Sequence, residues 1–344
     1  MLLLIGVAIG QTPVVPSAPT AVTEFPVLHP VASGGKIGFI DSSPNLVIPY
    51  RFDYVAKFSE GLAYFLEKGR SGYVDTTGKV MFDEERFCSS VRFDFTEGLA
   101  GFEFATRRKG NNYLRHRLRG YRDRTGKIVI PPRFFNASDF HEGVAAVNEK
   151  LNAKWGYIDK TGNYVIPPIF DYASDFSEGM AAVAVDQRCG YIDHAGKFVI
   201  RPFIEDENGC GPFREGVALV GRNDFGLIDT SGHYVIPPQH ATAWPTMREG
   251  LIWSPWASPQ GFYDKNGKLV IDTSSYSNAR AFSEGLAAVK KDKYGYINKK
   301  GELVIPLQFD NALDFVDGLA MVGTDEGWVY IDKSGKVVWK GASF

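Results

Sequence analysis

An arginine-rich stretch between Thr106 and Arg124 holds the densest group of side chains that could recognise a ligand. Its alternating arginines, at 115, 117 and 119, would point to one side of a strand. Guanidinium groups bind phosphates and carboxylates through paired hydrogen bonds, so a phosphate, carboxylate or acidic-glycan contact is predicted. The alternative is a long hairpin whose basic edge only blunts strand pairing. The predicted ligand-binding residues here are Arg107, Arg108, Lys109, Arg115, Arg117 and Arg119.

A second irregular segment, "WPTMREGLIWSPW", brings tryptophans close to prolines. Trp253 and Trp256 are predicted to bind a sugar ring or a peptide, because indole offers a large contact area with few rotatable bonds. The alternative is a packed core, since Trp244 stands where other copies of the pattern have Phe.

The sequence contains no recognisable catalytic or metal-binding motif. The six histidines are scattered, and neither a nucleophile elbow nor a phosphate-binding glycine loop occurs. The many Asp residues lack the spacing of a calcium loop and suit turns instead. We therefore expect no enzymatic activity, no metal and no cofactor. The alternative is a secreted hydrolase whose carboxylates come from neighbouring repeats.

Most of the chain is one repeated unit of about 35 residues. Each unit contains F-x-E-G-L-A-x-V, then W/Y-G-Y-I-D-x-x-G, then V-I-P-P-x-F-D-x-A, and about nine copies run from Phe25 to Lys340. The three blocks are short β-prone runs that end at Gly, Asp or Pro. D-x-x-G predicts a tight hairpin loop, in which Asp accepts backbone hydrogen bonds and Gly takes a positive φ.

These motifs, including the literal Lys154, Trp155 and Gly156, resemble the WG-repeat family, also called KWG repeats, which is widespread in bacteria. The resemblance implies a binding or scaffold module and transfers no catalytic residue. It covers residues 25–344 as a single β domain with a basic insertion at 105–119.

Two all-β architectures fit the repeat. A unit this small cannot bury its own apolar faces, so neighbouring units must cover one another. Three antiparallel strands, about 35 residues and nine copies differ from ordinary propeller blades, which have four strands and form rings of 4 to 8. The last copy also holds all three blocks and needs no strand from the N-terminus. The sequence therefore favours an open β-solenoid or superhelix over a closed β-propeller.

The net charge and the N-terminal segment limit the possible partners and the cellular location of the protein. The net charge is −2, which argues against nucleic acid as a partner. No apolar run reaches the length of a membrane-spanning helix. Residues 1–24 comprise an apolar stretch of signal-peptide size, without a basic start, and a Pro/Ser/Thr-rich linker. We expect a secreted or periplasmic monomer that binds a protein or a cell-envelope polysaccharide, with a cytoplasmic location as the alternative. Cys88, Cys189 and Cys210 allow at most one disulfide, which the sequence does not assign.

Overall fold

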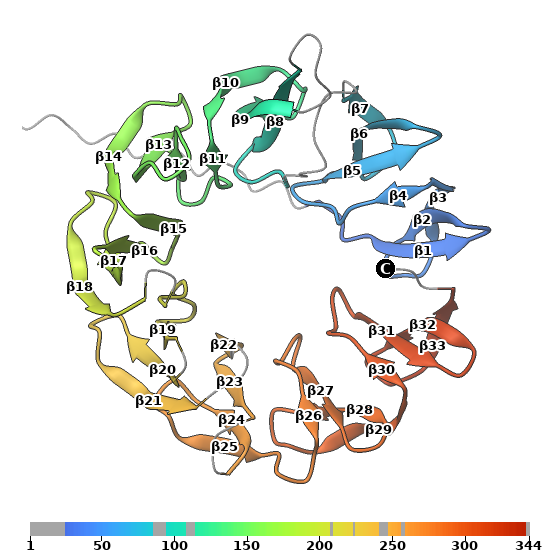
Figure 1. Ribbon diagram of the computed structural model, residues 1–344. Coiled ribbons are helices and arrows are strands. Elements are labelled where there is room, and N and C mark those ends of the chain that lie inside the picture. The colour runs from blue at the N-terminus through green and yellow to red at the C-terminus, as the bar shows by residue number, and fades with distance from the viewer. Residues whose placement is uncertain are drawn as a thin grey trace, which may run out of the picture.

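The computed structural model is a ring of nine small antiparallel sheets, or blades (Figure 1). It describes residues 25–84, 94–107, 114–206, 209–222, 224–240, 247–255 and 259–341. Of residues 105–107, 114–116 and 239–240 it describes the backbone alone. The predicted N-terminal segment, residues 1–24, lies outside this range.

Blades one to three contain strands β1 to β10. They are β1 (His29–Ser33), β2 (Lys36–Ile40) and β3 (Leu46–Phe52); β4 (Tyr54–Val55), β5 (Leu62–Glu67), β6 (Arg70–Asp75) and β7 (Val80–Asp83); and β8 (Leu99–Arg107), β9 (Leu114–Asp123) and β10 (Ile128–Phe134).

Blades four to six contain strands β11 to β21. They are β11 (Asn136–Ala137), β12 (Val144–Asn148), β13 (Trp155–Asp159) and β14 (Tyr164–Phe170); β15 (Tyr172–Ser177), β16 (Met180–Val185), β17 (Arg188–Ile192) and β18 (Phe198–Ile204); and β19 (Val217–Gly221), β20 (Asp224–Asp229) and β21 (Tyr234–His240).

Blades seven to nine contain strands β22 to β33. They are β22 (Met247–Arg248), β23 (Leu251–Ser254), β24 (Gly261–Tyr263) and β25 (Leu269–Asp272); β26 (Asn278–Ala279), β27 (Leu286–Lys290), β28 (Tyr294–Asn298) and β29 (Leu303–Phe309); and β30 (Asn311–Ala312), β31 (Leu319–Thr324), β32 (Gly327–Asp332) and β33 (Val337–Lys340).

The prediction of an open array is wrong, because the ring closes. The Tyr330 hydroxyl of blade nine donates a 3.0 Å hydrogen bond to the Pro30 carbonyl of blade one. The backbone N–H of Ala32 donates to the Gly341 carbonyl at 2.9 Å, which brings the end of β33 against β1. Val31 and Ile40 share an apolar cluster with residues of β31 and β32. The fold is therefore a nine-bladed β-propeller.

The expected three-stranded unit is also wrong for most blades. Six of the nine sheets among the described residues have a fourth strand, which lies nearest the middle of the ring (Figure 1). In three of the blades this innermost strand is only an Asn-Ala dipeptide, and it lies within the F-D-x-A end of the repeat. A two-residue strand lets four strands fit into about 35 residues.

Adjacent blades hold one another through their cores. Leu99, Tyr121 and Phe134 of blade three pack with Phe140 and Ile158 of blade four, and the other junctions repeat this pattern. A buried tyrosine on the third strand then donates its hydroxyl proton to a backbone carbonyl of the next blade. These bonds join Tyr121 to Ser138, Tyr157 to Ser174, Tyr191 to Gly211, Tyr296 to Leu313 and Tyr330 to Pro30. Burial raises the pKa of each phenol, so the donating proton is kept.

The repeat gives the two faces of the ring different loops. Successive antiparallel strands reverse direction, so loops alternate between the faces. The turn face carries the E-G turns before each second strand and the D-x-x-G turns after each third strand, as at 178–179 and 159–162. The hairpin face carries the loops between the second and third strands, such as 149–154. The ends of β8 and β23 lead toward the hairpin face, whereas Glu249 and Gly250, within the tryptophan-rich segment, form an E-G turn on the turn face.

Candidate functional site

The turn face is occupied by contacts between blades. The Glu of each E-G turn adopts a left-handed backbone, with φ between 47° and 55°, and its carboxylate accepts a backbone N–H from the next blade's turn. Seven such contacts occur among the described residues. They join Glu60 to Gly98, Glu97 to Gly143, Glu142 to Gly179, Glu178 to Gly216, Glu215 to Gly250, Glu249 to Gly285 and Glu284 to Gly318.

A basic residue of the next blade completes several of these contacts. Lys160 lies 3.1 Å from Glu97, Lys333 lies 3.1 Å from Glu284, and His194 lies 2.9 Å from Glu142. The repeated Glu residues are thus not a row of free catalytic carboxylates. They hold neighbouring blades together.

The repeated Asp residues form the predicted hairpin loops. One oxygen of Asp159 accepts the N–H groups of Thr161 and Asn163 at 2.9 and 3.0 Å, and Gly162 has a φ of +88°. Within the described residues, no three His, Cys, Asp or Glu side chains come together as metal ligands.

The predicted basic patch is partly internal. Arg117 and Arg119 lie 3.3 and 3.8 Å from the two oxygens of Glu103, which is only 3% exposed on the neighbouring strand β8. Arg119 also donates a 3.4 Å hydrogen bond to the Ala137 carbonyl of blade four. These two arginines therefore neutralise a buried carboxylate and contact the next blade, while Arg117 keeps about half of its side chain exposed.

The other residues of that patch are described less fully. Arg107 ends β8, and Arg115 lies in β9 beside it, but only their backbones are described. Arg108 and Lys109 fall outside the described residues, so their ligand-binding role stays a prediction.

Of the predicted tryptophan pair, the structure describes only Trp253. Trp253 on β23 packs against the buried cluster of Phe262, Phe282 and Ile297, and its indole N–H lies 3.4 Å from the Thr273 hydroxyl. Trp256 lies outside the described residues. The core alternative thus accounts for the contacts of Trp253.

Trp155, which the sequence suggested only as part of the building unit, separates two clefts. The first, about 520 Å³, is on the hairpin face and is lined by Asn136, Asn152, Lys154, Asp186 and Gln187, among others. The second, about 570 Å³, runs beside β15 toward His141, Asp175 and Arg214. The side chains of Asn136, Asn152 and Gln187 make no hydrogen bond within the described part of the chain. An aromatic ring between free amides is a typical surface for a polar ligand.

The hairpin of blade four makes the first cleft. This hairpin connects the paired residues Val147 and Gly156. It is longer than the equivalent hairpin of blade eight, which connects Val289 and Gly295. Leu151 at its tip is 68% exposed. The same ring position in blade eight is Tyr294, next to a Lys293–Asp310 ion pair that matches Lys154–Asp171. The sequence signal for the cleft was the hairpin of blade four, which is three residues longer than that of blade eight.

Three aspartates from successive blades interact beside the second cleft. Burial raises the pKa of Asp139 to about 6, and the nearby charges of Asp175 and Asp94 add to the shift. Asp175 lines the cleft and lies 3.6 Å from His141. One buried oxygen of Asp139 has no hydrogen-bond partner within the described residues. Within the described residues, neighbouring repeats thus bring a carboxyl with a raised pKa, Asp139, close to a second carboxylate that lines a cleft, Asp175.

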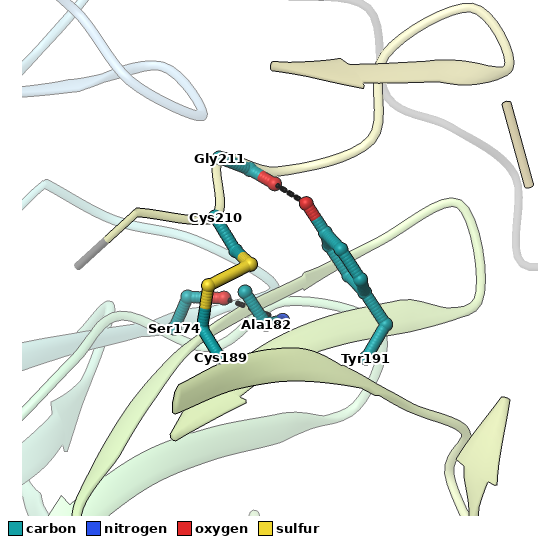
Figure 2. The surroundings of a disulfide bond; sticks show 6 residues. All are labelled: Ser174, Ala182, Cys189, Tyr191, Cys210 and Gly211. Carbon is teal, nitrogen blue, oxygen red and sulfur yellow. Dashed lines mark hydrogen bonds between the residues drawn. A yellow bond between two sulfur atoms is a disulfide. The ribbon is translucent and has the colours of Figure 1, made fainter. Parts of the chain in front are cut away.

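A disulfide joins Cys189 of blade five to Cys210 at the start of blade six (Figure 2). Both residues are buried, and the same junction holds the bond between Tyr191 and Gly211. Cys189 stands at the position that Trp155 has in blade four, and Cys210 at the position of Ala173 in blade five. The cystine thus replaces a packing contact between blades.

Comparisons with known proteins agree with the repeat and the fold. The model of the WG containing repeat matches residues 37–70, 120–150, 155–189, 190–224, 225–253, 261–293 and 294–328, which is more than half of the chain. No curated protein matches the sequence.

Among solved structures, a eukaryotic initiation factor is similar in fold, with a TM-score of 0.61, 10% identity, and coverage of 92% of this chain and 96% of that one. BamB from Moraxella catarrhalis has a TM-score of 0.42 at 10% identity, covering 88% of this chain and 94% of that one. A streptogramin B lyase has a TM-score of 0.35 at 13% identity, covering 88% and 95%. At these identities the first likeness supports the fold alone, and the other two carry no argument about function.

Proposed function

The chain belongs to the WG-repeat family, and on that premise we propose that it is a non-enzymatic binding protein whose hairpin face holds a polymer of the cell envelope. The single observation that carries the proposal is the difference between the two faces. Carboxylate contacts between blades occupy the turn face. The longer hairpin of blade four and the first Trp155 cleft lie on the hairpin face.

Polysaccharide is the polymer that the Trp155 clefts favour. An indole face packs against the apolar side of a sugar ring, while amides and charged groups bind its hydroxyls. Trp155 with the free amides of Asn136, Asn152 and Gln187 supplies both kinds of contact. Arg117, exposed on the neighbouring blade, adds a positive charge that suits an acidic glycan. A protein partner on the same face is the other outcome that the test below distinguishes.

The proposed location is outside the cytoplasm. Disulfides form and persist in oxidising compartments and are rare in the cytosol, and the Cys189–Cys210 bond supports export. No helix in the described residues is long and apolar enough to span a membrane. We propose that the protein is a monomer. We propose no nucleic acid partner, because a net charge of −2 gives no field that gathers polyanions.

The test is retention on insoluble peptidoglycan, together with capture of proteins from an envelope extract. The arginine variant must not expose Glu103 as an unpaired buried charge, so Arg117→Ser and Arg119→Ser are combined with Glu103→Gln. Retention of the wild type and loss in this variant or in Trp155→Ala support the proposal. A wild type that binds neither polymer nor protein would overturn it.

A second candidate function, hydrolysis, rests on the Asp139 group. A carboxyl with a pKa of about 6 beside a second carboxylate is the arrangement of a general acid and its partner. Its test is release of soluble fragments from peptidoglycan by the wild type, Asp139→Asn and Asp175→Asn. Turnover by the wild type that both variants lose would favour the enzyme, and no turnover at any pH between about 4 and 8 would exclude this site as a hydrolase.

A further inference from the structure

A third cavity lies where the ring closes, apart from the hairpin face. It has a volume of about 680 Å³ and lies between blades one, two and nine. Its lining is mainly apolar and includes Phe39, Val55, Leu319 and Met321. This size and composition are typical of pockets for small ligands.

The cavity follows from the way blade one is built. Among the described residues, blade one has no innermost strand, and β1 is bonded at its inner edge by the Gly341 carbonyl, through Ala32, and by the Tyr330 hydroxyl, through Pro30. In blade four, that place is taken by β11 and then by Phe140, which is fully buried. Apolar side chains of β1, β2 and β31 therefore line an opening that the repeat fills elsewhere.

Two side chains of the lining, His29 and Lys57, each have a nitrogen without a hydrogen-bond or ion-pair partner within the described part of the chain. His29 is 5% exposed, and its Nε2 makes no hydrogen bond within the described residues, although the ring packs edge-on against Tyr330. A buried imidazole nitrogen without a partner is costly, so it marks a place where a ligand atom can bind.

Lys57 is exposed on the same lining and forms no ion pair with a described carboxylate. The lining carboxylates have partners of their own, because Asp314 binds Arg248 and Arg280, and Glu60 accepts the Gly98 N–H. Lys57 is thus the charge of the lining that a ligand could neutralise.

The two polar groups lie toward the same face. Lys57 lies three residues before Glu60 of the E-G turn of blade two, and His29 begins the strand of blade one that leaves the turn face. We infer that the closure cavity binds an alkyl carboxylate, with its anionic head near Lys57 and His29 and its single acyl chain among the apolar residues. This site goes beyond the proposed polymer binding and does not depend on it.

Calorimetric titration of the full chain with dodecanoate, below its micelle concentration, tests this inference. Dodecanol and lysophosphatidylcholine are the comparison ligands, because the first lacks the charge and the second lacks a free carboxylate. We expect saturable 1:1 binding of dodecanoate and at least tenfold weaker binding of the other two. No saturable binding, or dodecanol binding as tightly as dodecanoate, would overturn the inference.

Two variants with matched controls locate the site. Val316→Trp places an indole at the mouth of the cavity and should weaken dodecanoate binding at least tenfold. Val165→Trp on β14, with a native exposure of 48% against 49% for Val316, should leave it unchanged. Lys57→Glu should weaken binding severalfold, and Lys127→Glu, another exposed lysine, should not. Equal binding by Val316→Trp and Val165→Trp, or by the two lysine variants, would also overturn the inference.

Discussion

The Tyr330 hydroxyl and the Pro30 carbonyl, 300 residues apart in the chain, form a 3.0 Å hydrogen bond that closes the ring. The same bond joins Tyr157 to Ser174 within the array, at 2.8 Å. The last blade thus contacts the first as any blade contacts its neighbour.

If the ring is closed, removing the tyrosine hydroxyl at the closing junction should destabilise the protein as much as removing it at an internal junction. Tyr330→Phe and Tyr157→Phe should each lower the free energy of unfolding by about 1 kcal/mol, because each leaves a buried carbonyl without its donor. Urea denaturation of both variants measures this. A Tyr330→Phe variant as stable as the wild type, beside a destabilised Tyr157→Phe, would show an open array in solution.

The disulfide should stabilise one junction. The double variant Cys189→Ala/Cys210→Ala is expected to lose about 2 to 4 kcal/mol of unfolding free energy, since the bond closes a loop of about 20 residues. Denaturation with and without a reductant provides the check. A reductant should lower the free energy of unfolding of the wild type and leave that of the double variant unchanged. If the reductant also destabilised the double variant, the stabilisation could not be assigned to the Cys189–Cys210 bond.

The raised pKa of Asp139 should make stability depend on pH. The folded-state pKa of Asp139, about 6, is above its unfolded value, so the folded chain binds this proton more tightly. Its contribution is complete below about pH 4 and is lost as pH rises through 6. Asp139→Asn should therefore be more stable than the wild type at pH 7, by about 1 to 3 kcal/mol, with no difference near pH 4.

Asp310 is the matched control for that measurement. Its hydrogen bond to Lys293 holds the pKa of Asp310 below its usual value, so its contribution is present at neutral pH and lost on acidification. Asp310→Asn should destabilise at pH 7 and not at low pH, the opposite trend. Parallel pH profiles for the two variants would refute the assignment of the raised pKa to Asp139.

The sequence predicted the repeat, its hairpins and the need for each unit to be covered by the next. It did not predict closure, because the innermost strand is as short as Asn136–Ala137 and is hidden in the end of the third block. In addition, no block of the repeat from one end of the chain completes the blade at the other end. The ring closes through contacts between blades, such as Tyr330 with Pro30, and a repeat pattern cannot distinguish these from any other junction.

The candidate site was predicted less well, for a physical reason. Irregular composition drew attention to the arginine and tryptophan segments, yet Arg117 and Arg119 are paired with Glu103, a residue of the regular β8 strand. Trp155 belongs to the copy of the repeat that has the literal Lys-Trp-Gly motif, so it was interpreted as part of the building unit. It lines a cleft because the adjacent hairpin is longer and the next blade supplies Gln187.

The role of the hairpin face is tested most directly by depletion of protein from solution by purified peptidoglycan. Trp155→Ala and Tyr294→Ala remove equivalent aromatic residues from blades four and eight, and only the first lies between the clefts. We predict that Trp155→Ala weakens retention about tenfold, or about 1.4 kcal/mol, while Tyr294→Ala is retained like the wild type. Equal retention of both variants and the wild type would contradict the account.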